Sequence, residues 1–83
     1  MSCIDQRVLG AAADAYAAAR REYGDAKAAA DQAYERLQAS PETIEYQIDW
    51  NVARREEAAA AWRVKDSEER YRKAGGYVRE SDE

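Results

Sequence analysis

The sequence predicts an all-α fold, an antiparallel two-helix hairpin with a coiled-coil-like seam rich in alanine. The first observation is an unbroken apolar repeat at spacings of three and four, which is typical of a helix that packs lengthwise on another helix. The second is a single Ser-Pro-Glu interruption at residues 40–42, and the third is a helix-forming segment that follows it and ends at two glycines. Two long helices joined by one short turn are antiparallel neighbours.

The first helix is predicted over about residues 4–38, with Ser2 or Asp5 as its N-cap. Every second layer of its repeat is alanine, which lets the two helix backbones approach closely. Gly24 lies away from this seam, and the repeat keeps its phase across it, so we expect the helix to continue there. The predicted seam residues are Leu9, Ala12, Tyr16, Ala19, Tyr23, Ala26, Ala30, Ala33 and Leu37.

The turn is predicted at residues 39–40, and the second helix over residues 41–73. Ser40 is the expected N-cap, Pro41 suits the first helical position, and Glu42 meets the positive end of the helix dipole. Gly75 and Gly76 are expected to end the helix. We expect residues 77–83 to form a mobile acidic tail.

The second helix has two apolar faces when its residues are placed at 100° per position. The face assigned to the hairpin seam contains Ile44, Ile48, Val52, Ala59 and Trp62. The face assigned to a dimer or partner interface contains Tyr46, Trp50, Ala53, Glu57, Ala60, Val64 and Tyr71. A hairpin covers only one of these faces, and an exposed apolar patch usually marks an association surface.

The first helix also has an apolar arc of about half its circumference, wider than one partner helix needs. The additional residues are Ile4, Val8, Ala11, Ala15, Ala18 and Ala29. We therefore expect two hairpins to associate as a homodimer, an antiparallel four-helix bundle with two-fold symmetry. The alternative is a monomer whose aromatic rings lie flat on alanine and whose arginine stems cover the remaining apolar surface.

Composition indicates a single domain of 83 residues without a disulfide framework, because Cys3 is the only cysteine. The sequence contains no histidine, so neither a zinc site nor a histidine-based catalytic centre is predicted. Cys3 has no partner for nucleophilic catalysis, and Glu57 is expected to make a register-setting ion pair rather than to bind metal. We therefore predict no catalytic residue, no metal and no cofactor.

Charge and hydropathy limit the choice of partner and compartment. The net charge is −4 with the signs interleaved, which argues against a nucleic-acid partner. We see no apolar run long enough to span a membrane and no signal peptide. The lone cysteine fits a reducing compartment, so we expect a cytoplasmic protein.

The sequence therefore predicts a non-enzymatic protein–protein interaction module. Its favoured form is a small inhibitor or regulator that occupies a surface on a larger protein, by analogy with phage-encoded anti-defence proteins such as anti-CRISPR proteins. One alternative is a structural or assembly subunit that self-associates. The other is a nucleic-acid-binding hairpin dimer that uses the doublets Arg20-Arg21 and Arg54-Arg55.

Overall fold

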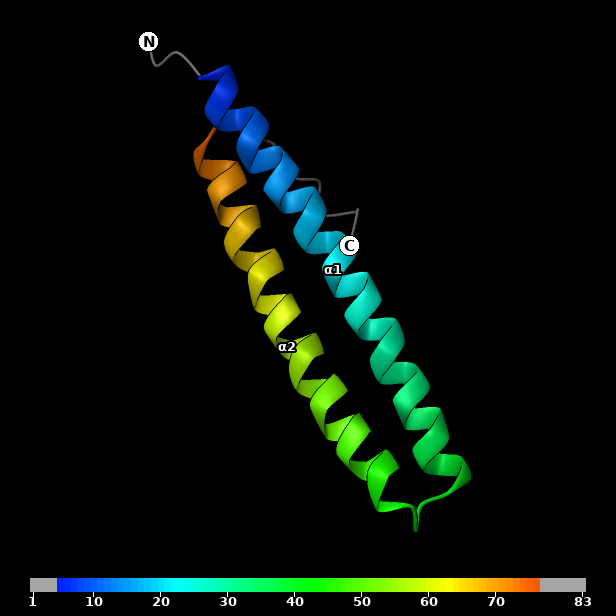
Figure 1. The fold of residues 1–83 in the computed structure, drawn as a ribbon. Coiled ribbons are helices and arrows are strands. Elements are labelled where there is room, and N and C mark those ends of the chain that lie inside the picture. The colour runs from blue at the N-terminus through cyan, green and yellow to red at the C-terminus, as the bar shows by residue number, and fades with distance from the viewer. Residues whose placement is uncertain (1–4, 77–83) are drawn as a thin grey trace.

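The chain folds into two long antiparallel helices that contact each other along their whole length (Figure 1). The computed structural model describes residues 5–76, in which α1 spans Gln6–Ala39 and α2 spans Ile44–Lys73. The hairpin is a thin rod of 62 × 21 × 13 Å. The predicted all-α hairpin is confirmed. Predictions for Ser2, Cys3 and Ile4, and for the tail at residues 77–83, lie outside the described residues.

α1 begins at a side-chain cap and continues to the turn without a break. The carboxylate of Asp5 accepts a hydrogen bond from the backbone N–H of Arg7 at 2.9 Å, which satisfies one of the free donors at the start of the helix. The helix passes through Gly10 and Gly24, where an added Cβ would meet nothing within 4 Å beyond its chain neighbours and the adjacent backbone of its own helix. The continuity expected at Gly24 is therefore confirmed.

The turn differs from the predicted one, because α2 starts three residues later than Pro41. The backbone N–H of Thr43 donates to the carbonyl of Ser40 at 3.1 Å, which closes a tight turn with Pro41 in its second position. The fixed φ of proline suits that turn position as well as it suits the first residue of a helix. Thr43, not Ser40, is the N-cap residue of α2, and Ser40 instead ends α1 by donating its N–H to the carbonyl of Arg36.

The end of α2 lies at Lys73, as predicted, and uses both glycines. Gly75 has a φ of 101°, a left-handed conformation that favours glycine. Its N–H donates to the carbonyl of Arg72 at 3.0 Å, and the N–H of Gly76 donates to the carbonyl of Tyr71 at 2.9 Å. These two hydrogen bonds form a Schellman motif. Gly76 also lies against the ring of Tyr71, where a Cβ would collide with it.

The core between the helices consists of small side chains. The buried residues are Ala19, Ala30, Ala33, Ala53, Ala60 and Ser67. Within residues 5–76, no side chain larger than these is buried. The hairpin therefore brings its helices together through small layers and keeps its large side chains at the edges of the contact or outside it.

Candidate protein-interaction surface

The predicted seam of α1 lies against α2 along its full length. Ala19, Ala30 and Ala33 are buried, and the other six predicted residues of the repeat are half-buried. The alternation of larger residues with alanine thus coincides with the line of contact between the helices.

The structure reverses the assignment of the two faces of α2. The face turned toward α1, called the inner face below, contains Tyr46, Trp50, Ala53, Glu57, Ala60, Val64 and Tyr71, all buried or half-buried. The face assigned to the seam is exposed and is called the outer stripe below; it contains Ile44, Ile48, Val52, Ala59 and Trp62. The seam prediction for α2 is therefore wrong, and the residues expected to meet a partner meet α1 instead.

The reason for the reversal is the length over which each face stays apolar. The inner face keeps small residues at Ala53, Ala60 and Ser67, one heptad apart, and these match the alanine layers of α1. The corresponding series on the outer stripe has a charged residue, Arg55, at its centre. Beyond Trp62 its next position is also charged, at Asp66. The inner face carries a single charge, Glu57, and otherwise stays apolar or small as far as Tyr71. A contact that extends over the whole helix therefore buries more apolar surface on the inner face.

Aromatic rings close the edges of the inner face. The ring centroids of Tyr16 and Tyr71 lie 5.8 Å apart with an interplanar angle of 30°, and those of Tyr34 and Trp50 also lie 5.8 Å apart. The guanidinium carbon of Arg54 lies 4.8 Å from the centroid of Trp50, a cation–π distance. Trp50 and Tyr71, expected at a partner interface, are thus engaged within the hairpin with Tyr34 and with the predicted seam residue Tyr16.

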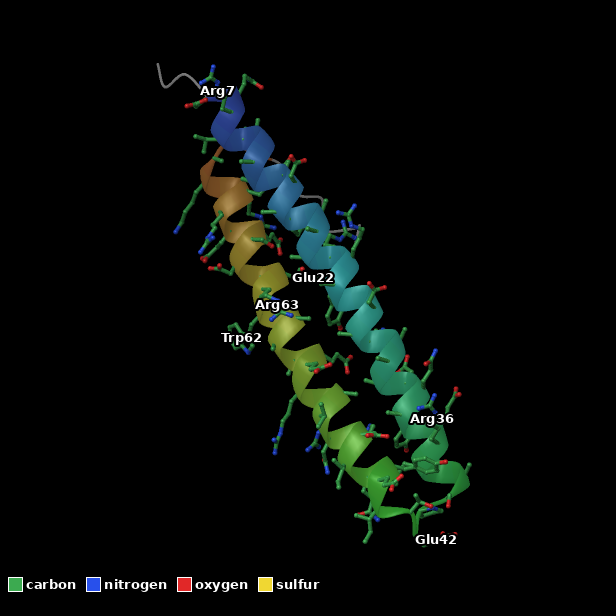
Figure 2. The ribbon with its side chains drawn as sticks, in the orientation of Figure 1. Arg7, Glu22, Arg36, Glu42, Trp62 and Arg63 are labelled. Carbon is green, nitrogen blue, oxygen red and sulfur yellow. The ribbon has the colours of Figure 1, made fainter. Side chains whose placement is uncertain are left out.

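The outer stripe exposes the largest apolar side chains of α2 to solvent. Trp62 is 71% exposed, Ile44 68%, Ile48 56% and Val52 48%. The stripe extends over about 27 Å at 1.5 Å per residue and lies about 160° around the helix from the inner face. Figure 2 shows Trp62 projecting from α2 on the side away from α1. In other proteins, exposed apolar rows of this size are typical of association surfaces.

Charged residues divide and border the outer stripe. Arg55 lies at its centre, and Glu45, Asp49 and Glu56 lie along one border. No residue within 5–76 forms an ion pair with any of these four. The stripe therefore carries charges of both signs that the hairpin itself leaves unmatched.

The charged border of the outer stripe continues past Glu56 to Arg63, which makes an ion pair with α1. Nε of Arg63 and a carboxylate oxygen of Glu22 lie 3.4 Å apart, and Figure 2 shows the two side chains meeting between the helices. Of the wider apolar arc predicted on α1, Val8, Ala11, Ala15 and Ala29 are exposed, and Ala18 is half-buried. Alanine side chains offer little area each, so the outer stripe remains the main exposed apolar surface.

The described part of the chain presents no constellation for metal chemistry. Within residues 5–76, no three cysteine, aspartate or glutamate side chains gather closely enough to hold an ion. Neither α1 nor α2 combines the length and the apolar character needed to cross a membrane. Comparisons of the chain with protein-family models, with curated proteins and with solved structures each gave no match.

Proposed function

We propose that this chain is a non-enzymatic protein-interaction module that works by covering its outer stripe with the surface of another protein. The observation that carries the proposal is the exposure of Trp62, Ile44 and Ile48 on one side of a continuous helix. Amphipathic helices bind proteins by laying such a row of anchors into an apolar groove. Trp62 is the anchor of the residue type most enriched in binding hot spots.

The favoured role is that of a small regulator or inhibitor that occupies a surface on a larger protein. The stripe residues already lie on a formed helix, so binding carries a smaller cost of ordering the backbone than binding by an unfolded segment would. The analogy with phage-encoded anti-defence proteins belongs to this role. The alternative is an assembly subunit in which the same stripe joins copies of the chain.

A nucleic-acid-binding role has less support from the positions of the arginines. Arg54 lies over Trp50 at the edge of the inner face, whereas Arg55 lies in the outer stripe. The doublet therefore does not form one basic surface, and Glu56 and Glu57 follow it directly. Binding that weakens steeply with salt would indicate phosphate contacts and support this role.

Photo-crosslinking in the source cell tests the proposal. Trp62 is replaced by the photo-reactive amino acid benzoylphenylalanine, and a matched control carries it at Val8, which is also exposed but lies on α1. We expect discrete adducts from position 62 and none of comparable yield from position 8. The adduct mass separates the roles: an adduct with one larger protein supports a regulator, and adducts made only of copies of this chain, whether two or more, support self-association. Equal adduct yields at the two positions would contradict the proposal.

A further inference from the structure

We propose that the outer stripe is covered by a second copy of this chain, with the two α2 helices antiparallel and Ile44 of each copy against Trp62 of the other. The inference rests on the proposed function, because it requires the stripe to be a protein-binding surface. It names the occupant of that surface and its register.

The composition of the core argues for an occupant that is always present. Only alanine and serine side chains are buried between α1 and α2 within residues 5–76. A scaffold of this size without disulfides or metal usually gains its stability from oligomerisation or from unusually well-packed large side chains. Here three of the four isoleucine and valine side chains of α2 lie in the outer stripe, and only Val64 lies on the inner face. A second copy is available wherever the chain is made, and it brings an identical stripe.

The area of the stripe fits a two-fold pair. Its four large side chains expose between 48% and 71% of their surface. At about 150–250 Å² for an aromatic side chain and less for isoleucine or valine, this is on the order of 400 Å² per copy. Two copies would bury about 800 Å² through these side chains alone, and the border residues would bring the total toward the roughly 1,200 Å² of a stable interface.

The distribution of side-chain size favours the antiparallel direction. With Ile44 against Trp62 of the second copy, Ile48 falls opposite the small Ala59, and Val52 falls opposite Arg55. Large side chains thus meet small or flexible ones along the stripe. In a parallel pair, Arg55 would lie directly opposite Arg55 of the second copy. The antiparallel register offsets these two arginines by four residues, about 6 Å along the helix, and places each opposite Val52.

The unmatched charges fit the same register. Arg55 comes within reach of Asp49 of the second copy, an acid that forms no ion pair within residues 5–76. Arg63, at the other end, lies near Glu45 of the second copy while keeping its contact with Glu22. Two-fold symmetry repeats both contacts. Charges at such positions set register and orientation between paired helices.

The pair differs in shape from the four-helix bundle predicted from the sequence. The outer stripe and the inner face lie on nearly opposite sides of α2, at about 160° by helical geometry. Two copies joined through their stripes therefore form a layer of four helices in the order α1, α2, α2, α1. A square bundle would instead require α2 to present the charged border that contains Glu45, Asp49 and Glu56.

Sedimentation equilibrium of the full chain tests the occupant. We expect a discrete dimer whose dissociation constant rises at least about 100-fold in Ile48→Glu, because the variant buries an unpaired carboxylate in the interface. Val8→Glu is the matched control, since Val8 is 55% exposed and Ile48 is 56% exposed. The control should leave the dissociation constant within about twofold of wild type. A wild-type monomer at 100 µM (about 1 mg/ml), or a dimer insensitive to Ile48→Glu, would overturn the inference.

Disulfide trapping tests the register in a Cys3→Ser background. Chains with Ile44→Cys and chains with Trp62→Cys should cross-link when mixed and should not cross-link alone. Cross-links within each single variant would indicate a parallel pair and overturn the antiparallel register. As a second measurement, Arg55→Glu should weaken the dimer at least about tenfold, and adding Asp49→Arg should restore it. The absence of any restoration would likewise contradict this register.

These outcomes separate the inference from the proposed function. A monomer whose photo-reactive group at position 62 still captures one larger protein refutes the second copy and keeps the interaction module. A monomer without any such adduct refutes both. A dimer that depends on Ile48 supports the second copy and an interaction module, and it favours the assembly subunit over the regulator, because the outer stripe is then not free for a larger protein.

Discussion

The two faces of α2 contain similar apolar residue types, but one is packed against α1 and the other is exposed to solvent. The inner face holds Trp50 and Ala60 against α1, whereas the outer stripe leaves Trp62 and three β-branched aliphatic residues in solvent. The more hydrophobic side chains are thus on the exposed face. The difference teaches that continuity along the helix and small residues at heptad spacing decide which face pairs with an alanine-rich partner, rather than the bulk of individual side chains.

The largest loss of hairpin stability is expected from a charged side chain at position 60, because Ala60 is fully buried. Ala60→Arg would force a long charged side chain into a layer between the helices that holds only small side chains, at a cost of at least about 3 kcal/mol. We expect the chain to lose most of its helix signal at room temperature. Thermal melts followed by far-UV circular dichroism measure this.

The matched control is Ala58→Arg, two positions away on the exposed part of the same helix and outside the outer stripe. It should change stability by no more than about 0.5 kcal/mol. If Ala60→Arg melted like Ala58→Arg, the inner face would not be the seam, and the comparison between the two faces would fail.

A smaller effect is expected from truncating the two tryptophans. Trp50→Ala removes a half-buried ring that contacts Tyr34 and Arg54, and should destabilise the hairpin by about 2 kcal/mol at every protein concentration. Trp62→Ala removes a ring that projects into solvent in the hairpin. Its effect should grow with protein concentration, because the ring becomes buried only when the outer stripe is covered.

Urea unfolding at several protein concentrations separates the two variants. The free energy of unfolding of a single hairpin is measured at the lowest protein concentration, where association contributes least. A concentration-independent loss in Trp62→Ala larger than that in Trp50→Ala would show that the outer stripe is part of the core, contrary to the observed exposure.

The fold was predictable because three signals agree: the unbroken repeat of α1, one interruption, and two glycines. The start of α2 was not, since Pro41 suits both a first helical position and a turn, and only the hydrogen bond from Thr43 to Ser40 distinguishes them. The faces of α2 were not assigned correctly because both have helical periodicity. The informative signal was the small heptad series Ala53, Ala60 and Ser67, together with Arg55 in the competing series.

The smallest expected effect comes from glycines that touch neither face. Gly24→Ala should stabilise the hairpin by about 0.5–1 kcal/mol, because alanine favours helix and its Cβ has open space beyond the adjacent backbone of its own helix. The control Gly75→Ala should destabilise by about 1 kcal/mol, since Gly75 has a φ of 101°. Denaturation midpoints measure both changes. Gly24 lies outside the outer stripe, so Gly24→Ala should raise the denaturation midpoint and leave the dimer dissociation constant unchanged. If the dissociation constant also fell, dimer affinity would depend on helix stability rather than on burial of the outer stripe.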